Sequence, residues 1–493
     1  MRETLTVLAG LLVLALLAAL IGPGFVDWRG YRPHFEARLA ETLGVETRIG
    51  GGIGLRLLPS PRLTLQNVRF GGGGAAETSR ASVETLTVEL ALAALTRGEF
   101  RIADARAEGA TVSLSFDEAG ALRLPARGGA GLPTQTSLDR LSIGRSVLIW
   151  QEAGREPVTI GPIAAEISAV SLAGPWRIEG EAAGASLRIT TGALEPDGKL
   201  RTKAFVTGQD IQLGFDGSVT LPATGSAPGL DGSFTLSPGG ALALSGKVSG
   251  GSRQLDLAGL VLDIAGGAAR LEGEGQFMPG SGGGVLALRA RRLDADALAE
   301  ALAARPGFER ALQGLPGQID LSLDLDQLIW RGEDFSAFGL RGKLDPQGLS
   351  EATASVRVAG ALLGASGSAD AQGVAGRLNL KAGDSRRIGL VLARAGLDPA
   401  LADLVAGLGQ IDAEAIGAWD GGRLALQRLM LTGSSGVRLD LSGDATAERL
   451  SARAVLNGFD LTNLPPGESV AVLLGARDLA LDLSLTQARF RNV

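Results

Sequence analysis

The chain of 493 residues has no cysteine, a single histidine and few aromatic side chains, which make up 4% of it. Without cysteine, neither a disulfide framework nor a thiolate metal site can form. Histidine is the commonest general base and metal ligand, and the single one, His34, is explained more simply as a solvated side chain than as a catalytic group. These shortages argue against a Ser-His-Asp hydrolase and against a thiolate-ligated metal site.

The charged residues give no sign of a nucleic-acid partner. Lysine and arginine together number 47 against 53 aspartates and glutamates, for a net charge of −6 without any basic run. A protein that binds nucleic acid needs a positive patch or stripe to neutralise phosphates. We therefore expect no nucleic acid among the partners of this chain.

No sequence motif predicts an enzyme or a cofactor. The glycine clusters lack the strand-G-x-G-x-x-G-helix context of a dinucleotide site, and Lys247 is not followed by the serine or threonine of a P-loop. Residues 320–326 place oxygen-bearing side chains at every second position, as a calcium loop does, but without its central glycine and final glutamate. Their alternation with leucine is typical of a strand with one solvated face. We expect no catalytic residue, no metal and no cofactor.

A long apolar run stands at the N-terminus. Residues 5–21 carry no charge, and a helix extended to residue 26 is about 33 Å long, enough to cross a hydrocarbon core of about 30 Å. The alternative is a cleaved secretory signal, but no A-x-A site follows the run. Trp28 and Tyr31 lie just beyond it, where aromatic side chains anchor a helix end at the membrane interface. We predict a retained transmembrane anchor over residues 1–26.

An amphipathic helix is predicted directly after the anchor. Apolar side chains recur there at every fourth position, namely Tyr31, Phe35, Leu39 and Leu43. The helix could lie on the lipid headgroups or cover the first strands. Its polar face mixes acidic and basic residues rather than being basic, which favours the second position.

From residue 45 to the C-terminus the period of the pattern changes from four to two. Short stretches alternate apolar with small or polar residues and are separated by Gly, Asp and Asn turns, without a repeat of fixed length. This predicts a long antiparallel meander, with a β-bulge at Asn67 where the alternation slips by one residue. Short helices are expected over residues 92–97, over residues 294–315 as two pieces broken at residues 305–307, and over residues 398–408.

The organisation that we predict has a transmembrane anchor, an N-terminal unit over residues 27–126, a glycine-rich linker within residues 127–136, and an extended β-region over residues 137–493. The fold class is mainly β: a transmembrane helix followed by an elongated, curled antiparallel sheet with a few short helices. Half of the strand side chains are aliphatic, so one face of this sheet must be covered. Either the sheet packs on itself, or it forms a trough that offers its apolar face to ligands. The pattern alone leaves both open.

Several motifs follow the predicted span: residues 27–36 (Asp-Trp-Arg-Gly-Tyr-Arg-Pro-His-Phe-Glu), Gly44, Ile49-Gly50, residues 57–63 (Leu-Leu-Pro-Ser-Pro-Arg-Leu) and residues 95–102. With these motifs, the first 110 or so residues resemble the opening of the AsmA family of Gram-negative envelope proteins. It implies an inner-membrane anchor, a periplasmic body and a role in outer-membrane integrity. The family is also similar to chorein-type bridge proteins, whose β-grooves carry lipid acyl chains between membranes.

The C-terminal part of the sequence departs from this resemblance. Residues 477–493 look like the beginning of a further stretch found in family members, and the sequence stops there. Either a shortened member or an incomplete sequence would have this appearance.

The function that follows is the shielding and movement of phospholipid acyl chains along a hydrophobic β-groove, in support of outer-membrane biogenesis. The alternative is an envelope scaffold that transports nothing and influences outer-membrane protein assembly. The expected partners are membrane phospholipids, the inner membrane through a single span, and an outer-membrane protein, with the bulk of the chain in the periplasm. The residues predicted to line the groove are Leu55, Leu57, Leu63, Leu65, Leu321, Leu323, Leu325, Leu479, Leu481 and Leu483.

Overall fold

A computed structural model describes most of the chain from residue 27 onward. The described residues are 27–43, 45–71, 80–95, 97, 101–117, 123, 137–153, 156–171, 174–221, 228–238, 242–279, 282–303, 317–394, 399–434, 436–446, 448–458 and 478–487. The predicted anchor, residues 1–26, lies outside this set. Within the set, no helix has both the length and the apolar character needed to span a bilayer.

The chain divides into two compact units. Unit 1 comprises Met1–Ser237 and Ser245–Asp256, and unit 2 comprises Pro238–Leu244 and Leu257–Val493. The strands β13 (Gly229–Pro238), β14 (Leu242–Gly251) and β15 (Leu255–Ile264) fall where the sequence passes from one unit to the other.

Unit 1 is a β-sheet with short helices at its N-terminal end. Its elements are η2 (Trp28–Tyr31), α2 (Arg32–Leu43), β1 (Thr47–Ile49), β2 (Ile53–Arg56), β3 (Arg62–Phe70), β4 (Arg80–Leu90), α3 (Leu92–Leu95), β5 (Arg101–Glu108), β6 (Thr111–Phe116), β7 (Ser137–Glu152), β8 (Val158–Ala169), β9 (Trp176–Ala182), β10 (Ala185–Thr191), β11 (Lys199–Thr207) and β12 (Ile211–Thr220).

The strands of unit 1 pair mostly with their neighbours in the sequence. β1 and β2 both pair with β3, and β7 to β12 follow one another in antiparallel order. Between them, β5 and β6 each pair antiparallel with β4 and parallel with β7. The predicted linker, residues 127–136, lies outside the described residues, and the strands before and after it belong to the same sheet.

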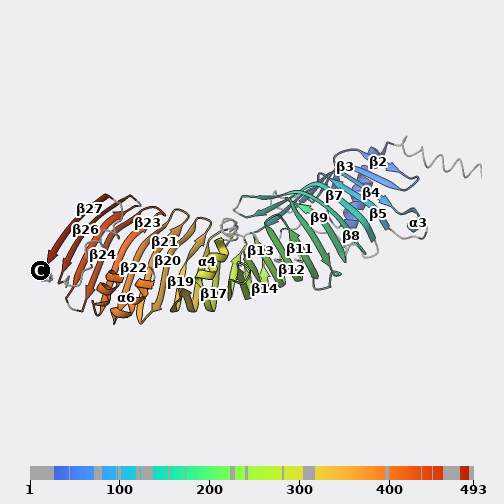
Figure 1. The fold of residues 1–493 in the computed structure, drawn as a ribbon. Coiled ribbons are helices and arrows are strands. Elements are labelled where there is room, and N and C mark those ends of the chain that lie inside the picture. Colours follow the sequence, from blue (N-terminus) through green and yellow to red (C-terminus); the bar gives the residue numbers. More distant parts are fainter. Residues whose placement is uncertain are drawn as a thin grey trace, which may run out of the picture. The chain divides into compact units, whose positions relative to one another are not determined.

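Unit 2 is also built of β-strands, and its described residues include three helices between strands. Its elements are β16 (Ala269–Met278), β17 (Gly283–Asp294), α4 (Ala295–Ala303), β18 (Ile319–Trp330), β19 (Glu333–Asp345), β20 (Gly348–Val358), β21 (Ala361–Asp370), β22 (Val374–Ala382), α6 (Ser385–Arg394), α7 (Pro399–Ala406), β23 (Ile411–Trp419), β24 (Leu424–Gly433), β25 (Arg438–Ala445), β26 (Arg449–Asn457) and β27 (Asp478–Thr486). Figure 1 shows β19 to β24, β26 and β27 side by side.

The prediction of a purely antiparallel meander is wrong at several places. β17 pairs parallel with β18, β26 pairs parallel with β27, and β7 is parallel to both β5 and β6. Two parallel neighbours need a crossover connection of about a dozen residues or more, because the chain must return to the end of the sheet at which the first strand began. Residues 295–318 and 458–477 are connections of this length, and the first contains α4.

Most of the predicted helices are confirmed, and among the described residues one α-helix was missed. α2, α3, α4 and α7 lie within the predicted ranges, whereas the second half of the predicted pair, residues 304–315, lies outside the described residues. The missed helix is α6, whose first turn is capped by Asp384 through the backbone amide of Arg386, 3.0 Å from its Oδ1. An aspartate at this position satisfies an amide that has no partner within the helix.

The prediction of an extra residue at Asn67 is wrong, although the sheet is irregular at this place. β3 pairs Gln66 with Thr85 and Val68 with Val83, so one residue of each strand lies between these pairs. The extra residue is on the other side of β3: Ile49 pairs with Val68 and Ile53 with Leu65, so residues 50–52 face only two residues of β3. The φ of 53° at Asn67 is the left-handed conformation that asparagine tolerates better than most residues. The left-handed turn of the backbone at Asn67 leaves Leu65 and Val68 in one buried cluster although two residues separate them.

Candidate functional site

The three leucines predicted on β18 share one face of unit 2. Leu321, Leu323 and Leu325 pair with Leu286, Leu288 and Ala290 of β17 on one side, and with Gly342, Leu340 and Phe338 of β19 on the other. Side chains that are directly opposite in neighbouring strands point to the same side of a sheet. The alternation in residues 320–326 therefore separates an apolar face from a polar one, as the sequence predicts.

The apolar face continues without interruption from β17 to β27. In register order, one row of paired residues across these strands consists of Leu288, Leu323, Leu340, Ala354, Ala365, Leu378, Ala415, Leu429, Leu441, Ala454 and Leu483. At about 4.8 Å between strands, such a row is about 48 Å long. Two of the predicted residues, Leu323 and Leu483, thus lie near opposite ends of the same aliphatic row.

The opposite face of these strands is polar and carries ion pairs between adjacent strands. Nitrogen–oxygen distances are 3.1 Å for Arg377 and Glu414, 3.0 Å for Arg428 and Asp440, and 2.9 Å for Arg453 and Asp482. Exposed pairs of this kind add little stability, but they identify the face that water covers. We call it the outer face, and the aliphatic side the inner face.

Helices cover part of the inner face and seal it. Under α6, Ile388 packs with Ala361, Ala382 and Ile411 in a cluster of buried side chains. Near α4, Leu325 is 3% exposed and belongs to a second buried cluster, against which Leu321 and Leu323 pack. The side chains of these three predicted residues are therefore partly or wholly covered by other residues of the chain.

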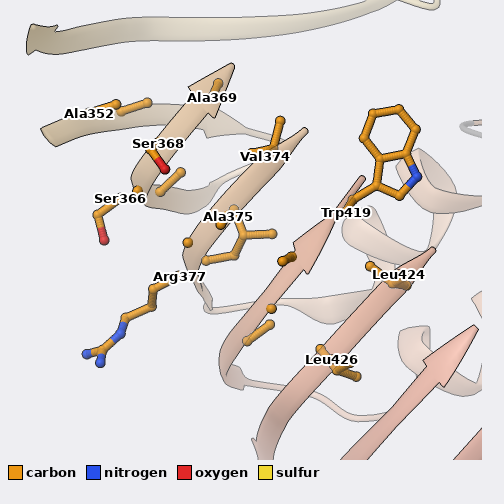
Figure 2. Close-up of a pocket in the computed structure, with 18 residues that line it drawn as sticks. Ala352, Ser366, Ser368, Ala369, Val374, Ala375, Arg377, Trp419, Leu424 and Leu426 are labelled. Atoms are coloured by element: carbon orange, nitrogen blue, oxygen red, sulfur yellow. The ribbon is translucent and has the colours of Figure 1, made fainter. Parts of the chain in front are cut away.

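Beyond the helices the same face is open. Val374, Trp419 and Leu424 are opposite one another on β22, β23 and β24, and Val374 and Trp419 are 53% and 52% exposed. Leu378, four residues along β22 from Val374, is 51% exposed. A hollow of about 280 Å³ lies over this part of the sheet, with Val374, Trp419 and Leu424 among its lining residues (Figure 2). Exposed apolar side chains gathered in a hollow mark a binding surface.

Two glycines form the floor of the hollow. Gly376 and Gly417 are register partners on β22 and β23. A Cβ atom on Gly376 would lie 2.2 Å from the carbonyl oxygen of Ser366, and one on Gly417 would lie 2.6 Å from that of Ala425. Glycine inside a strand marks such close approaches and tight bends. Sequence reasoning missed this hollow, although the alternation in residues 374–378 could have indicated its apolar side.

The C-terminal candidates lie on the open part of the inner face. Leu481 and Leu483 of β27 pair with Ala452 and Ala454 of β26, and they are 56% and 58% exposed. Leu479 occupies the next register position, opposite Leu450; its side chain is outside the described set.

Unit 1 has an apolar face of its own. A row of register partners from β2 to β12 consists of Leu55, Leu63, Val88, Ala105, Leu141, Ile167, Ile178, Ile189, Ala204 and Phe215. The predicted Leu55 and Leu63 belong to this row. Leu65 is 1% exposed and is sealed in a cluster with Phe35 and Leu39 of α2, while Leu57 is exposed and follows the end of β2.

Helix α2 covers the first strands of unit 1, which confirms the favoured alternative for this helix. Besides the packing of Phe35 and Leu39, the Glu36 carboxylate accepts a hydrogen bond of 2.7 Å from the Ile49 amide, and Arg32 Nη2 donates one of 2.9 Å to the Gly51 carbonyl. These contacts fix the position of the helix on the sheet.

The two aromatic residues predicted at the membrane interface lie together before α2. Trp28 and Tyr31 belong to η2, and their ring centroids are 5.8 Å apart. Tyr31 is exposed, and the ring of Phe35 lies 6.5 Å from that of Trp28. Their contact with a membrane stays a prediction.

The perturbed titratable groups belong to exposed ion pairs and turns. Hydrogen bonding from Arg201 lowers the pKa of Asp216, and hydrogen bonding to Glu351 raises the pKa of Lys343. Next to the hollow, the amides of Arg423 and Gly422 lower the pKa of Asp420. In the part of the chain that the structure describes, no group of three or more His, Cys, Asp or Glu residues is placed to hold a metal ion.

Comparison with known proteins bears on the N-terminal part of the chain. The model of the AsmA family matches residues 1–136, which confirms the resemblance found in the sequence. None of the curated proteins matches this chain.

Proposed function

We propose, from the match of residues 1–136 to the AsmA family, that this chain is an inner-membrane-anchored periplasmic protein that shields phospholipid acyl chains along the apolar faces of units 1 and 2. In this role it supports the biogenesis of the outer membrane. Residues 1–26 supply the anchor, Trp28 and Tyr31 lie at the membrane interface, and the outer faces of the sheets are in water. The chain carries out no reaction and needs no cofactor.

The observation that carries the proposal is the unbroken aliphatic row of unit 2 together with its exposed stretch. An antiparallel sheet can have one wet face, but its apolar face must be covered. Between β22 and β27, side chains such as Leu378 and Leu483 remain about half exposed in the described part of the chain. An acyl chain placed there would gain about 0.8 kcal/mol for each methylene withdrawn from water.

The chemistry of this surface suits lipid chains better than a ligand with a defined shape. Leucine, alanine, valine and glycine offer dispersion contacts but no hydrogen-bond donors or acceptors along the row. The binding free energy would depend on how much apolar area is buried and not on which strands bury it. An acyl chain could therefore move between equivalent places along the row. This property is what a carrier needs.

A non-transporting envelope scaffold is the second candidate, and one observation favours it. Leu65 and Leu325 are almost fully buried by the chain itself, so parts of the apolar faces serve as ordinary core. In a scaffold, the exposed stretch would be covered by a protein partner of the outer membrane instead of lipid.

The direct test combines lipid analysis with site-specific crosslinking. The full chain is purified in mild detergent and its bound lipids are identified by mass spectrometry, with photoreactive residues at Leu378 and Leu483 and, as matched controls on the outer face, at Asn379 and Ser484. We expect phospholipid to copurify and to crosslink from the two leucine positions only. Absence of lipid, or equal crosslinking from both faces, would contradict transport.

A further inference from the structure

Three neighbouring strands of unit 2 share an irregularity of the backbone. On each strand, two inner-face residues that pack in the buried clusters are three positions apart, where strict alternation would make the spacing even. These pairs are Ala290 and Leu293 on β17, Leu325 and Leu328 on β18, and Phe335 and Phe338 on β19. At the same place Ala337 has a φ of 51°, a left-handed conformation that is uncommon outside glycine. Two consecutive residues of each strand therefore turn away from the inner face.

The outer face is hollowed next to this irregularity. A hollow of about 990 Å³ is lined by residues of β16, β17 and β18, and we call it the arginine hollow. Its charged lining residues, all exposed, are Arg270, Arg289, Arg291 and Arg292 together with Glu272, Asp324 and Asp326. Clefts of about 300–1,000 Å³ have the size that holds small organic ligands. The arginine hollow therefore has room for a molecule larger than an inorganic anion.

Within the part of the chain that the structure describes, the charged groups of the arginine hollow are not paired with one another. Elsewhere on the outer face, arginines are held by carboxylates of the adjacent strand, as Arg377 is by Glu414 at 3.1 Å. Arg289 is flanked by Glu272 and Asp324 in the register, but among the described residues its side chain forms an ion pair or hydrogen bond with neither. Water or a ligand must therefore satisfy these guanidinium and carboxylate groups.

The residue types of the arginine hollow indicate the chemistry of a ligand. The planar guanidinium group matches two oxygens of a phosphate, which it can bind with two parallel hydrogen bonds. The carboxylates accept hydrogen bonds from hydroxyl groups. Four arginines against three carboxylates leave an excess of one positive charge. A ligand with one phosphate and several hydroxyl groups fits this set better than a polyphosphate, which the carboxylates would repel.

We propose that the arginine hollow binds a phosphate ester that carries hydroxyl groups, the chemistry of glycerol phosphate, either free in solution or as the headgroup of a phospholipid. The arginines of β17, among them Arg289 and Arg291, bind the phosphate, and Asp324 and Asp326 of β18 accept hydrogen bonds from the hydroxyl groups. The hollow lies on the opposite side of the strands from the apolar inner face. The proposal therefore goes beyond the shielding of acyl chains and does not depend on it.

The test is isothermal titration calorimetry of the full chain in mild detergent. Glycerol 3-phosphate is the free probe, with glycerol and inorganic phosphate for comparison, and dihexanoyl phosphatidylglycerol is the headgroup probe. The variant carries Arg289→Gln and Arg291→Gln, which remove two exposed guanidinium groups from the hollow. The matched control carries Arg377→Gln and Arg428→Gln, which remove two guanidinium groups from ion pairs of the same face.

We expect the native chain and the control to bind glycerol 3-phosphate with the same affinity, and the variant to bind it about ten-fold or more weakly. Inorganic phosphate should bind more weakly than the ester, and glycerol should not bind. Arginine-dependent binding of the free ester would identify a soluble ligand, and such binding of dihexanoyl phosphatidylglycerol alone would identify a lipid headgroup. Either result supports the proposal.

Three results would overturn the proposal and leave the proposed function standing. The first is that the native chain binds neither phosphate ester. The second is that variant and control lose the same affinity, since the unpaired arginines would then have no special role. The third is that inorganic phosphate binds as tightly as the ester, because the carboxylates would then contribute nothing to recognition.

Discussion

Leu378 and Asn379 are consecutive residues of β22 that lie on opposite faces of the sheet. Leu378 is opposite Ala365 and Ala415, whereas Asn379 is opposite Gly364 and Glu414. Both side chains are exposed, so neither is needed to fill a core. Substitutions at these two positions can therefore test the role of the inner face without removing core packing.

The substitution Leu378→Asp is expected to reduce copurifying phospholipid several-fold, because it places a charge in the middle of the exposed apolar stretch. The free energy of unfolding should fall by less than about 1 kcal/mol, since half of the side chain is already in water. Lipid content by mass spectrometry and unfolding in urea are the two measurements. The matched control, Asn379→Asp, should change neither; if it reduces lipid as much as Leu378→Asp does, the inner face has no special role.

Leu325 and Leu483 are both predicted groove residues, but the structure gives them different environments. Leu325 is 3% exposed within a buried cluster, and Leu483 is mostly exposed on β27. Leu325→Ala should therefore cost about 2–5 kcal/mol of unfolding free energy, as for other large-to-small changes in a core. Leu483→Ala should cost less than about 1 kcal/mol. Equal costs in denaturant unfolding would mean that β27 is covered in solution.

The alternation of leucine with polar residues is what made the sheet predictable. In residues 320–326 the period of two is complete, and the register confirms that its leucines share one face. The same local rule found the irregularity at Asn67, where the alternation slips by one residue, but it put the extra residue on the wrong strand, because the partner segment, residues 50–52, shows no alternation of its own.

The features that the sequence could not predict depend on contacts between residues that are far apart in the chain. Strand direction depends on where the chain re-enters the sheet, so the parallel pairing of β26 with β27 could not be read from either strand. Similarly, Leu325 and Leu483 have the same local pattern, and the first one is core because side chains of other strands and of α4 pack around it. The hollow near Trp419 depends on which strands are neighbours, and Gly376 and Gly417 meet there from different strands.

The hydrogen bond from the Ile49 amide to the Glu36 carboxylate fixes α2 on the first strands of unit 1. Its loss in Glu36→Ala should cost about 1.5–3 kcal/mol, because a nearly buried amide loses a charged acceptor. Hydrogen exchange of the Ile49 amide should become faster, and thermal unfolding gives the stability. Glu41→Ala serves as the control: Glu41 is exposed and pairs with the exposed Arg38, so its loss should cost less than about 0.5 kcal/mol. Similar effects of both substitutions would contradict a specific role of the Glu36 contact.

The carboxylate of Glu89 makes the stability of unit 1 dependent on pH. The Ser60 hydroxyl donates a hydrogen bond to it, Arg62 Nη2 lies 2.5 Å from its Oε2, and these contacts lower the pKa of Glu89 from its usual value near 4.5. The folded state therefore binds fewer protons than the unfolded state in the acidic range. Its contribution to stability is complete above about pH 4.5 and is lost as the pH falls through the lowered pKa.

Substituting Glu89→Gln removes this titration while keeping an acceptor for Ser60. The variant should be less stable than the native chain at pH 7, and the difference between the two should shrink as the pH is lowered below about 4.5, because protonation removes the same charge from the native glutamate. Urea unfolding of both proteins between pH 3 and pH 7 measures this difference directly. A difference that stays constant across the range would show that the charge of Glu89 does not stabilise the fold.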